Sequence, residues 1–156
     1  MKYYYSKGWF RAKKKALALY SAEEAEYLHK SKQLYCVLVG DINRPYAFIE
    51  INNDFYGVTF LDDLLRCKLE YQFTLQDNGK LFLNMSVFRE FRGSSDNIAE
   101  ATIYTFAYSG NIVITKENTT TNEVLESRIN DSIESNWEIE PEFGNYENLL
   151  IIERNS

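Results

Sequence analysis

The most regular pattern in the chain is an alternation of apolar and polar residues over CKLEYQFTLQ, residues 67–76. A period of two residues is typical of a strand that buries one face. The next residues, Gln76 to Gly79, contain Asn-Gly, which adopts positive φ at low cost and favours a hairpin turn. The pattern therefore predicts a hairpin into a second strand, KLFLNMSVFREF. On that strand we expect one face to carry Leu81, Leu83, Met85 and Val87.

Other short apolar runs, separated by turn residues, predict further strands. LYCVLV ends at Gly40-Asp41, and AFIEI and FYGVTFL flank Asn52-Asn53-Asp54, which favours another hairpin. ATIYTFAY leads through Ser109-Gly110-Asn111 into IVITKE. Residues 41–117 are therefore predicted to form an antiparallel meander.

The N-terminal part has a different pattern. The region from Trp9 to Gln33 is the strongest helical candidate, because Ser21 and Glu24 have the spacing of a capping box and AEEAEYLHKSK places Glu early and Lys late. The preceding RAKKKALALY fits either a helix or a strand. We expect an α+β fold: a single domain, residues 1–156, in which an antiparallel β-meander of about six to seven strands carries an N-terminal helix packed on one face.

After Glu117 the chain becomes polar and the pattern is less regular. Leu125, Ile129 and Ile133 recur every four residues, which favours a short amphipathic helix, although the Thr-rich flanks fit a loop nearly as well. In WEIEPEFGNYENLL, residues 137–150, the rings of Trp137 and Phe143 are large enough to anchor the segment on the sheet. LLIIER is expected to form a last strand.

Length and composition narrow the class of protein. A chain of 156 residues is about one domain and can bury a core without disulfides or metals. No apolar run approaches the roughly 18–20 residues of a membrane span, and the N-terminus lacks the order of a signal peptide. Cys36 and Cys67 have no partner at metal-ligand spacing, so reduced, partly buried thiols are expected, and a disulfide between them would require the fold to bring them close. These features predict a cytoplasmic protein without membrane contact.

Charge is distributed unevenly along the chain. The net charge is −6, but residues 1–35 contain eight basic and three acidic residues, whereas residues 117–156 contain two basic and ten acidic residues. A basic N-terminal region and an acidic C-terminal region indicate either that the two regions pair with each other or that the protein has a charged partner.

The sequence lacks the usual signatures of catalysis and cofactor binding. His29 is the only histidine, so a His pair is excluded, and no G-x-S-x-G, G-x-x-x-x-G-K-S/T or G-x-G-x-x-G motif is present. We therefore expect no catalytic residues, no resident metal and no cofactor. The most obvious carboxylate pair is Asp62-Asp63, and adjacent residues of a strand point to opposite faces, which makes a poor metal clamp outside a turn.

Nucleic-acid binding is also disfavoured. A dense basic cluster follows Trp9 and Phe10, a combination that suits single strands. The sequence pI of about 4.9 argues against it, because typical nucleic-acid-binding proteins carry a dominant basic face. Solvation of the cluster, or pairing with the acidic tail, is the preferred interpretation. The cluster consists of Arg11, Lys13, Lys14 and Lys15.

Three stretches together carry a resemblance: FYGVTFLDD, then CKLEYQFTLQDNGKLFLNMSVFREF, then NWEIEPEFGNYENLL. This pattern, over roughly residues 46–154, resembles the small bacterial immunity proteins of contact-dependent growth inhibition and related polymorphic toxin systems. The resemblance lies in length, acidity and a W-E-x-x-P-E-F-G-x-Y ending. It implies a cognate toxin domain as partner, neutralised by tight binding without chemistry. Many such toxins are nucleases, whose basic grooves an acidic protein can fill.

An acidic surface with aromatic anchors would meet a basic partner quickly, because complementary fields raise association rates. The residues expected to bind the partner are Asp62, Asp63, Glu70, Glu138, Glu140, Glu142, Tyr146 and Glu147. Two alternatives stay open at this point. An aromatic-rich meander can enclose a small molecule, in which case a pocket lined by Tyr and Phe is expected. A metal-dependent enzyme would centre on Asp62 or Asp63.

Overall fold

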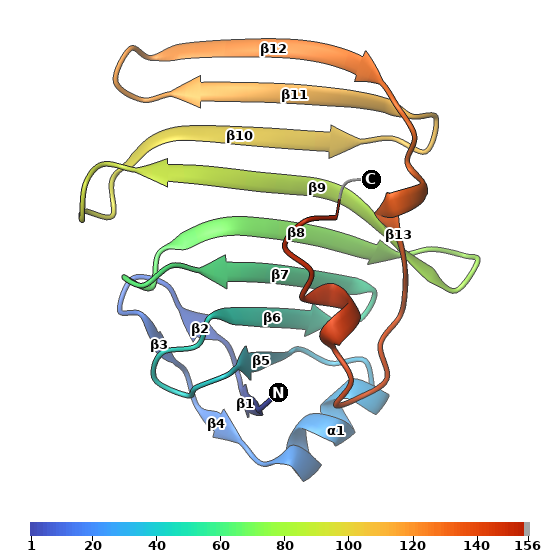
Figure 1. Cartoon of the computed structure of the whole chain (residues 1–156). Helices are drawn as coiled ribbons and strands as arrows, with labels where there is room; N and C mark the ends of the chain where they lie inside the picture. The colour runs from blue at the N-terminus through green and yellow to red at the C-terminus, as the bar shows by residue number, and fades with distance from the viewer. Residues whose placement is uncertain (155–156) are drawn as a thin grey trace.

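The computed structural model describes residues 1–154, and most of them belong to one large antiparallel sheet (Figure 1). Eleven strands form this sheet, and ten of them lie in the order β12-β11-β10-β9-β8-β7-β6-β5-β1-β4. The ten strands are β1 (Tyr3–Ser6), β4 (Leu19–Tyr20), β5 (Tyr35–Val39), β6 (Ala47–Asn52), β7 (Phe55–Leu61), β8 (Cys67–Leu75), β9 (Lys80–Phe91), β10 (Ile98–Phe106), β11 (Asn111–Asn118) and β12 (Glu123–Asn130).

The remaining elements are short and lie outside this order. The eleventh strand, β13 (Trp137–Ile139), pairs with the start of β9. A separate two-stranded sheet joins β2 (Trp9–Phe10) to β3 (Lys15–Ala16). The helix is α1 (Ala22–Lys30), and the 3-10 helices are η1 (Glu134–Asn136) and η2 (Glu147–Leu149). The architecture is therefore mainly β, with one short α-helix in the described chain.

The predicted meander is confirmed, and it is longer than expected. Each strand from β5 to β12 pairs antiparallel with the next strand along the chain. The hairpin through Asn78 and Gly79 joins β8 to β9, and Gly79 has a φ of +80°, as an Asn-Gly turn favours. Asn53, in the turn between β6 and β7, likewise has a φ of +56°.

The short amphipathic helix predicted around Leu125 and Ile129 is wrong. Residues 123–130 form β12, which pairs along its whole length with β11. Leu125 and Ile129 lie on one face of this strand, because a spacing of four residues is twice the strand period as well as about one helical turn. Ile133, which completed the apparent helical pattern, lies beyond the strand. The spacing alone could not separate the two structures.

The N-terminal helix is shorter than predicted and covers less of the sheet. Residues 9–20 contain β2, β3 and β4, and α1 begins only at Ala22. The predicted capping box is confirmed: the backbone N–H of Glu24 donates to Ser21 Oγ, and that of Ser21 donates to Glu24 Oε1, both at 3.1 Å. The helix packs at the end of the sheet formed by β1, β4 and β5, where Ala25 joins the core (Figure 1).

The capping box gives a direct test of this helix boundary. Replacing Ser21 with alanine is expected to lower the free energy of unfolding by about 1 kcal/mol, because the N–H of Glu24 loses its acceptor. Urea denaturation measures the change. Glu23→Ala, in the same helical turn but without a capping bond, is the matched control. Equal losses in the two variants would contradict a capping role for Ser21.

Hydrophobic cores lie on both faces of strands β5 to β8. On one face, Val37, Ile49 and Phe73 pack with residues of the C-terminal segment, including Tyr146 and Leu149. The other face carries a smaller core, which the β2–β3 hairpin covers through Trp9 and Ala16. This smaller core contains Cys36 and contacts Cys67, and both are free thiols, as predicted.

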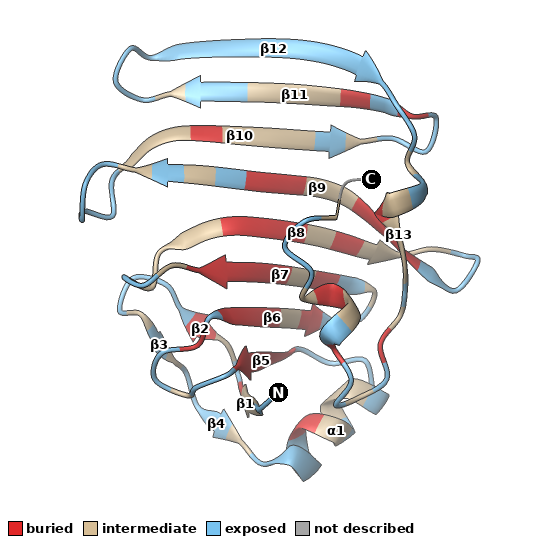
Figure 2. Cartoon of the chain, in the orientation of Figure 1, coloured by how far each residue is buried: buried red, intermediate tan, exposed pale blue. Residues whose placement is uncertain are grey.

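Burial falls steadily toward the β12 end of the sheet (Figure 2). Every residue of β5 is buried, whereas every residue of β12 is exposed. The last strand predicted for LLIIER is not found: Leu149 is buried at the end of η2, and Ile151 and Ile152 are exposed coil. The fold therefore has a well-covered half around β5–β8 and an open half at β10–β12.

Candidate functional site

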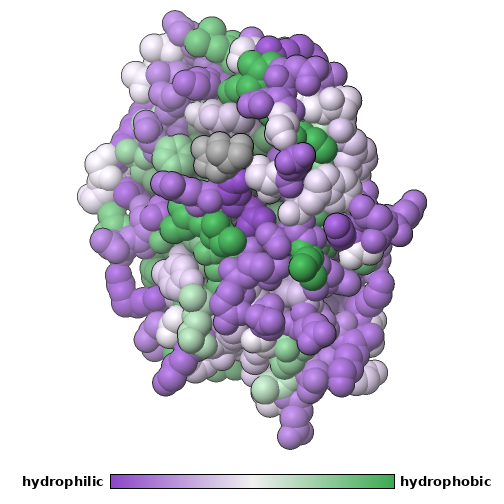
Figure 3. All heavy atoms as spheres, turned by 45° about the vertical axis from the view of Figure 1, so that its right-hand side comes forward, coloured by the Kyte–Doolittle hydropathy of each residue, from purple (hydrophilic) through white to green (hydrophobic). Residues whose placement is uncertain are grey.

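A groove of about 700 Å³ lies in the open half, between the sheet and the C-terminal segment, which we define as residues 131–154. Its floor is one face of strands β8 to β12, and one wall is the C-terminal segment. The floor includes Tyr71, Phe88, Tyr104, Phe106, Ile112 and Ile129. On this side of the molecule, hydrophobic side chains interrupt an otherwise polar surface (Figure 3).

A β-bulge in β9 determines which residues form this floor. Leu83 lies opposite Phe73, but Met85 lies opposite Gln72, so β9 carries one extra residue against β8. Beyond the bulge the faces exchange, and Ser86 and Phe88 join the groove face. The expectation that Met85 and Val87 share a face with Leu81 and Leu83 is therefore wrong. The alternation in the sequence is interrupted by an inserted residue that the apolar pattern does not reveal.

The groove face continues across the remaining strands, and the further register shift of the β9–β10 ladder, between Ile98 and Glu100, lies before the groove residues of β10. Tyr104 lies opposite Ser86 on one side and Ile114 on the other. Phe106 lies opposite Ile112, which in turn lies opposite Ile129 of β12. The groove floor is thus mainly aromatic and aliphatic, with Ser86 and Thr102 between the rings, and Phe88 and Ile129 are 45% and 46% exposed.

The C-terminal segment is fixed to the sheet at several points. The side-chain amide of Asn136, itself buried, donates to the carbonyl of Leu83 at 2.8 Å. Trp137 lies opposite Phe82 in the β13–β9 pairing, with ring centroids 4.8 Å apart. The hydroxyl of Tyr71, on the groove floor, donates to the carbonyl of Ile152. These contacts make the wall of the groove a built part of the fold.

Arg154 brings a charge to this wall, and Glu138 neutralises it. The Arg154 side chain is only 7% exposed, forms an ion pair with Glu138 and lies 5.1 Å from the ring centroid of Phe73. Burial raises the pKa of Glu138, but hydrogen bonds from Arg154 and Asn148 outweigh it and hold the pKa below its usual value. Glu138 is therefore a structural anion.

The other acidic residues predicted in the C-terminal segment have different environments. Glu140 accepts a hydrogen bond from the hydroxyl of Tyr56 at 2.9 Å. Glu142 and Glu147 are exposed. Of the four predicted glutamates of the segment, these two are the exposed ones.

Tyr146, also predicted to bind a partner, lies inside the protein. It is fully buried, its hydroxyl is 3.0 Å from that of Tyr35, and Tyr35 is in turn 2.8 Å from Nδ1 of His29. Burial raises the pKa of Tyr146 and Tyr35 and lowers the pKa of His29. The assignment of Tyr146 to an exposed binding surface is therefore wrong, because its ring anchors the C-terminal segment instead.

The remaining predicted residues are Asp62 and Asp63, in the loop between β7 and β8 (Figure 1), and Glu70, within β8. Asp62 and Asp63 follow β7, in the loop that leads to β8, and Asp63 is exposed. Glu70 is 8% exposed and forms ion pairs with Arg11 at 2.5 Å and Arg89 at 2.9 Å. The eight predicted residues therefore do not form one acidic surface.

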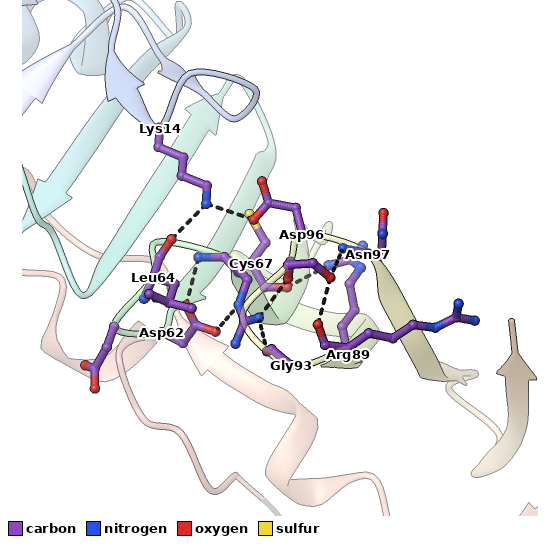
Figure 4. A network of polar contacts seen from close by, with 12 residues as sticks. Lys14, Asp62, Leu64, Cys67, Arg89, Gly93, Asp96 and Asn97 are labelled. Carbon is purple, nitrogen blue, oxygen red and sulfur yellow. Dashed lines mark hydrogen bonds and ion pairs between the residues drawn. The ribbon is translucent and has the colours of Figure 1, made fainter. Parts of the chain in front are cut away.

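The loops around Asp62 form a closed network of polar contacts (Figure 4). Asp62 Oδ1 accepts from the N–H groups of Leu64 and Arg66, both at 2.9 Å, and its Oδ2 accepts from Arg66 Nε at 2.7 Å. Burial raises the pKa of Asp62, but these bonds hold it below its usual value. Lys14 reaches Asp96 at 2.8 Å and the carbonyl of Leu64 at 3.0 Å. The basic N-terminal cluster thus contacts the middle of the chain and not the acidic tail.

The charged groups of this network already have partners within the protein, so few of them are available to bind a metal or an anion. Both oxygens of Asp62 already accept hydrogen bonds, and residues 1–154 contain no group of three or more His, Cys, Asp or Glu side chains that could hold a metal ion. Nearby lies a cavity of about 370 Å³ whose four basic residues each have an acidic partner. They are Arg11, Lys14, Arg66 and Arg89.

The described part of the chain has no helix long and apolar enough to cross a membrane. Comparisons with protein-family models, with curated proteins and with solved structures found no match. The resemblance to immunity proteins therefore depends on the sequence pattern alone.

The groove residues Phe88, Tyr104, Phe106 and Ile129 were not predicted as a site. A partial signal existed in β10, where Tyr104 and Phe106 alternate with polar or small residues. The alternation could not show that this face of the sheet is left uncovered, because that depends on where the C-terminal segment crosses the sheet.

Proposed function

We propose that this protein is an immunity protein that binds and neutralises a cognate bacterial toxin domain, and that the groove is the site of contact. The observation that carries the proposal is that the groove has an aromatic floor open to the surface and exposed carboxylates beside it. Exposed apolar surface with a polar rim is typical of protein-binding sites. Here it is built into a sheet that fixes its shape.

The charge around the groove suits a basic partner. Asp131 and Glu153 line the groove and are exposed, and Lys116 is the one exposed basic residue among its lining. Glu142 and Glu147 are also exposed, but they flank Phe143 and Tyr146, which pack beside β1 and β5, and neither lines the groove. A toxin nuclease with a basic substrate groove would meet apolar floor and negative rim together, and the complementary fields would raise the association rate.

Phe88→Asp is expected to weaken toxin binding at least about tenfold, because it places a charge on the apolar floor of the interface. Thr105→Asp is the matched control, since Thr105 is also exposed but lies on the opposite face of the sheet. The wild type and both variants first serve as baits in an affinity purification. Each protein that the wild type recovers is then expressed in bacteria, alone, with the wild type and with each variant. Growth rescue and Kd are the measurements.

The expected result is a domain that stops growth alone and is neutralised by the wild type and by Thr105→Asp, but less well by Phe88→Asp. Asp131→Lys/Glu153→Lys separates the charge contribution, because both carboxylates line the groove and are exposed, and it is expected to slow association and reduce its dependence on salt. If the wild type recovers no growth-inhibiting domain, or if Phe88→Asp protects as well as the wild type, the proposal fails.

The second candidate function is binding of a small molecule in the same groove. The volume of about 700 Å³ and the Tyr and Phe lining fall within the usual range for ligand pockets. The groove is open to the surface along one side, which suits this function less well than an enclosed pocket. Native mass spectrometry of the protein isolated from its own source would detect a bound molecule, and Phe88→Asp would abolish that signal.

A further inference from the structure

Strand β12 is a long free edge of the main sheet. It pairs with β11 on one side and has no strand on the other side within residues 1–154, and all eight of its residues are exposed. The strand at the opposite edge, β4, has only two residues. An unpaired edge of this length presents a row of backbone donors and acceptors to another strand.

The ladder shows which backbone groups point outward. Asn130 lies opposite Asn111, and the N–H of the next residue, Asp131, donates to the carbonyl of Gly110 at 3.0 Å. In an antiparallel ladder, alternate residues bond to the same neighbour, so the odd-numbered residues of β12 direct their N–H and C=O groups at β11. The outward-directed residues are Val124, Glu126, Arg128 and Asn130.

We propose that a second copy of this chain pairs with this edge, β12 against β12, antiparallel and about a two-fold axis at Ser127. Glu126 of each copy then lies opposite Arg128 of the other, and Val124 lies opposite Asn130. In this register all the outward-directed residues exchange backbone hydrogen bonds, so both edges are satisfied.

Charge selects this register over its neighbours. A shift of two residues along the strand would place either Glu126 opposite its own copy or Arg128 opposite its own copy, and like charges directly opposite each other are destabilising. A shift of one residue would set outward groups against inward ones. The side chain of Arg128 is 73% exposed and that of Glu126 is 56% exposed, and the contact between them is a long one, at 3.7 Å. Both side chains are therefore free to form closer ion pairs with the second copy.

Apolar side chains also match across the same axis. On the groove face, Leu125 of one copy would lie opposite Ile129 of the other, and these residues are 63% and 46% exposed in the single chain. Their pairing would cover exposed apolar surface and continue the groove floor from one copy into the next. Edge strands that avoid pairing usually carry repelling charges, whereas the middle of β12 carries Glu126 and Arg128, which are complementary to each other across the axis.

The test is the molecular mass in solution, measured by light scattering and sedimentation over a wide range of protein concentration. The wild type is expected to dimerise. Glu126→Arg and Arg128→Glu each set like charges opposite each other and are expected to weaken the dimer at least about tenfold. An equimolar mixture of the two single variants restores both opposite-charge pairs and is expected to dimerise again, as is the double variant Glu126→Arg/Arg128→Glu.

Two results would overturn the proposal. A wild type that stays monomeric throughout excludes the dimer, and single variants that dimerise as well as the wild type would assign the contact to another surface. Circular dichroism of each variant establishes that the charge changes leave the sheet intact. The dimer and toxin binding are tested separately. Phe88→Asp changes the groove floor and leaves β12 unaltered, so it is expected to weaken toxin binding and to leave the dimer intact.

Discussion

Replacing Tyr146 with alanine is expected to lower the free energy of unfolding by about 4 kcal/mol, within the range for removing a large buried aromatic side chain. Tyr146 is fully buried, and its ring lies 5.0 Å from that of Tyr3 and 6.4 Å from that of Phe143, centroid to centroid. The substitution leaves a cavity where the C-terminal segment meets the sheet. Since this segment is one wall of the groove, we also expect partner binding to be lost.

Urea denaturation measures the change in stability, and limited proteolysis measures release of the C-terminal segment. Tyr146→Phe is the matched control: it keeps the ring and removes the hydroxyl with its polar contacts, among them the contact with the hydroxyl of Tyr35, which retains His29 as a partner. A loss of about 1 kcal/mol is expected for this variant. If Tyr146→Ala stayed within about 1 kcal/mol of the wild type, the ring would not be the anchor of the segment.

The parts of the fold that could be predicted are those determined by neighbours in sequence. The β8–β9 hairpin follows from the alternation before Gln76 and from the Asn-Gly turn, and the start of α1 follows from Ser21 and Glu24. These signals are local, since a turn residue or a cap acts within four residues of itself. The meander was predictable because it joins one such hairpin to the next.

The parts that could not be predicted depend on contacts between distant residues. The bulge in β9 exchanges the faces beyond Leu83, and only pairing with β8 reveals it. Residues 123–130 became a strand because β11 offered an edge along their whole length, which overrides a weak helical spacing. The groove itself exists because the C-terminal segment crosses β8 and β9 and leaves the strands beyond them open.

Charge along the sequence was a poor guide to charge on the surface. Counting acidic residues indicated a single negative face, but Glu138 and Glu140 bond internally and Glu70 is buried. The two ion-pair partners of Glu70 are 19 positions away, at Arg89, and 59 positions away, at Arg11. A sequence count cannot distinguish a paired carboxylate from a free one, because pairing at such separations is decided by the fold.

Glu70→Gln is therefore expected to lower the free energy of unfolding by about 3 kcal/mol near neutral pH, the lower end of the range for breaking a buried ion pair. The substitution leaves the guanidinium groups of Arg11 and Arg89 without their shared carboxylate, while Thr59, 3.3 Å from Glu70, keeps an acceptor. The lower end applies because the Arg11 side chain is 47% exposed and retains a contact with Glu50 at 3.5 Å.

The pH dependence of this loss distinguishes an ionic role from a packing role. Burial raises the pKa of Glu70, but Arg11 and Arg89 outweigh it and hold the pKa below the ordinary value of 4.5. The folded state therefore binds the proton less tightly than the unfolded state, so the ionic stabilisation is complete above about pH 4.5 and is lost as the pH falls through the lower folded-state pKa.

Urea denaturation at pH 7 and near pH 3 should consequently show a difference between the wild type and Glu70→Gln that shrinks in acid. Glu142→Gln, which removes an exposed carboxylate, is the control and should match the wild type within about 0.5 kcal/mol at both pH values. A difference for Glu70→Gln that stays constant with pH would mean that the side chain stabilises the sheet by packing and hydrogen bonding alone. A shrinking difference would show that the carboxylate acts as the anion that holds the β2–β3 hairpin, through Arg11, against β8 and β9.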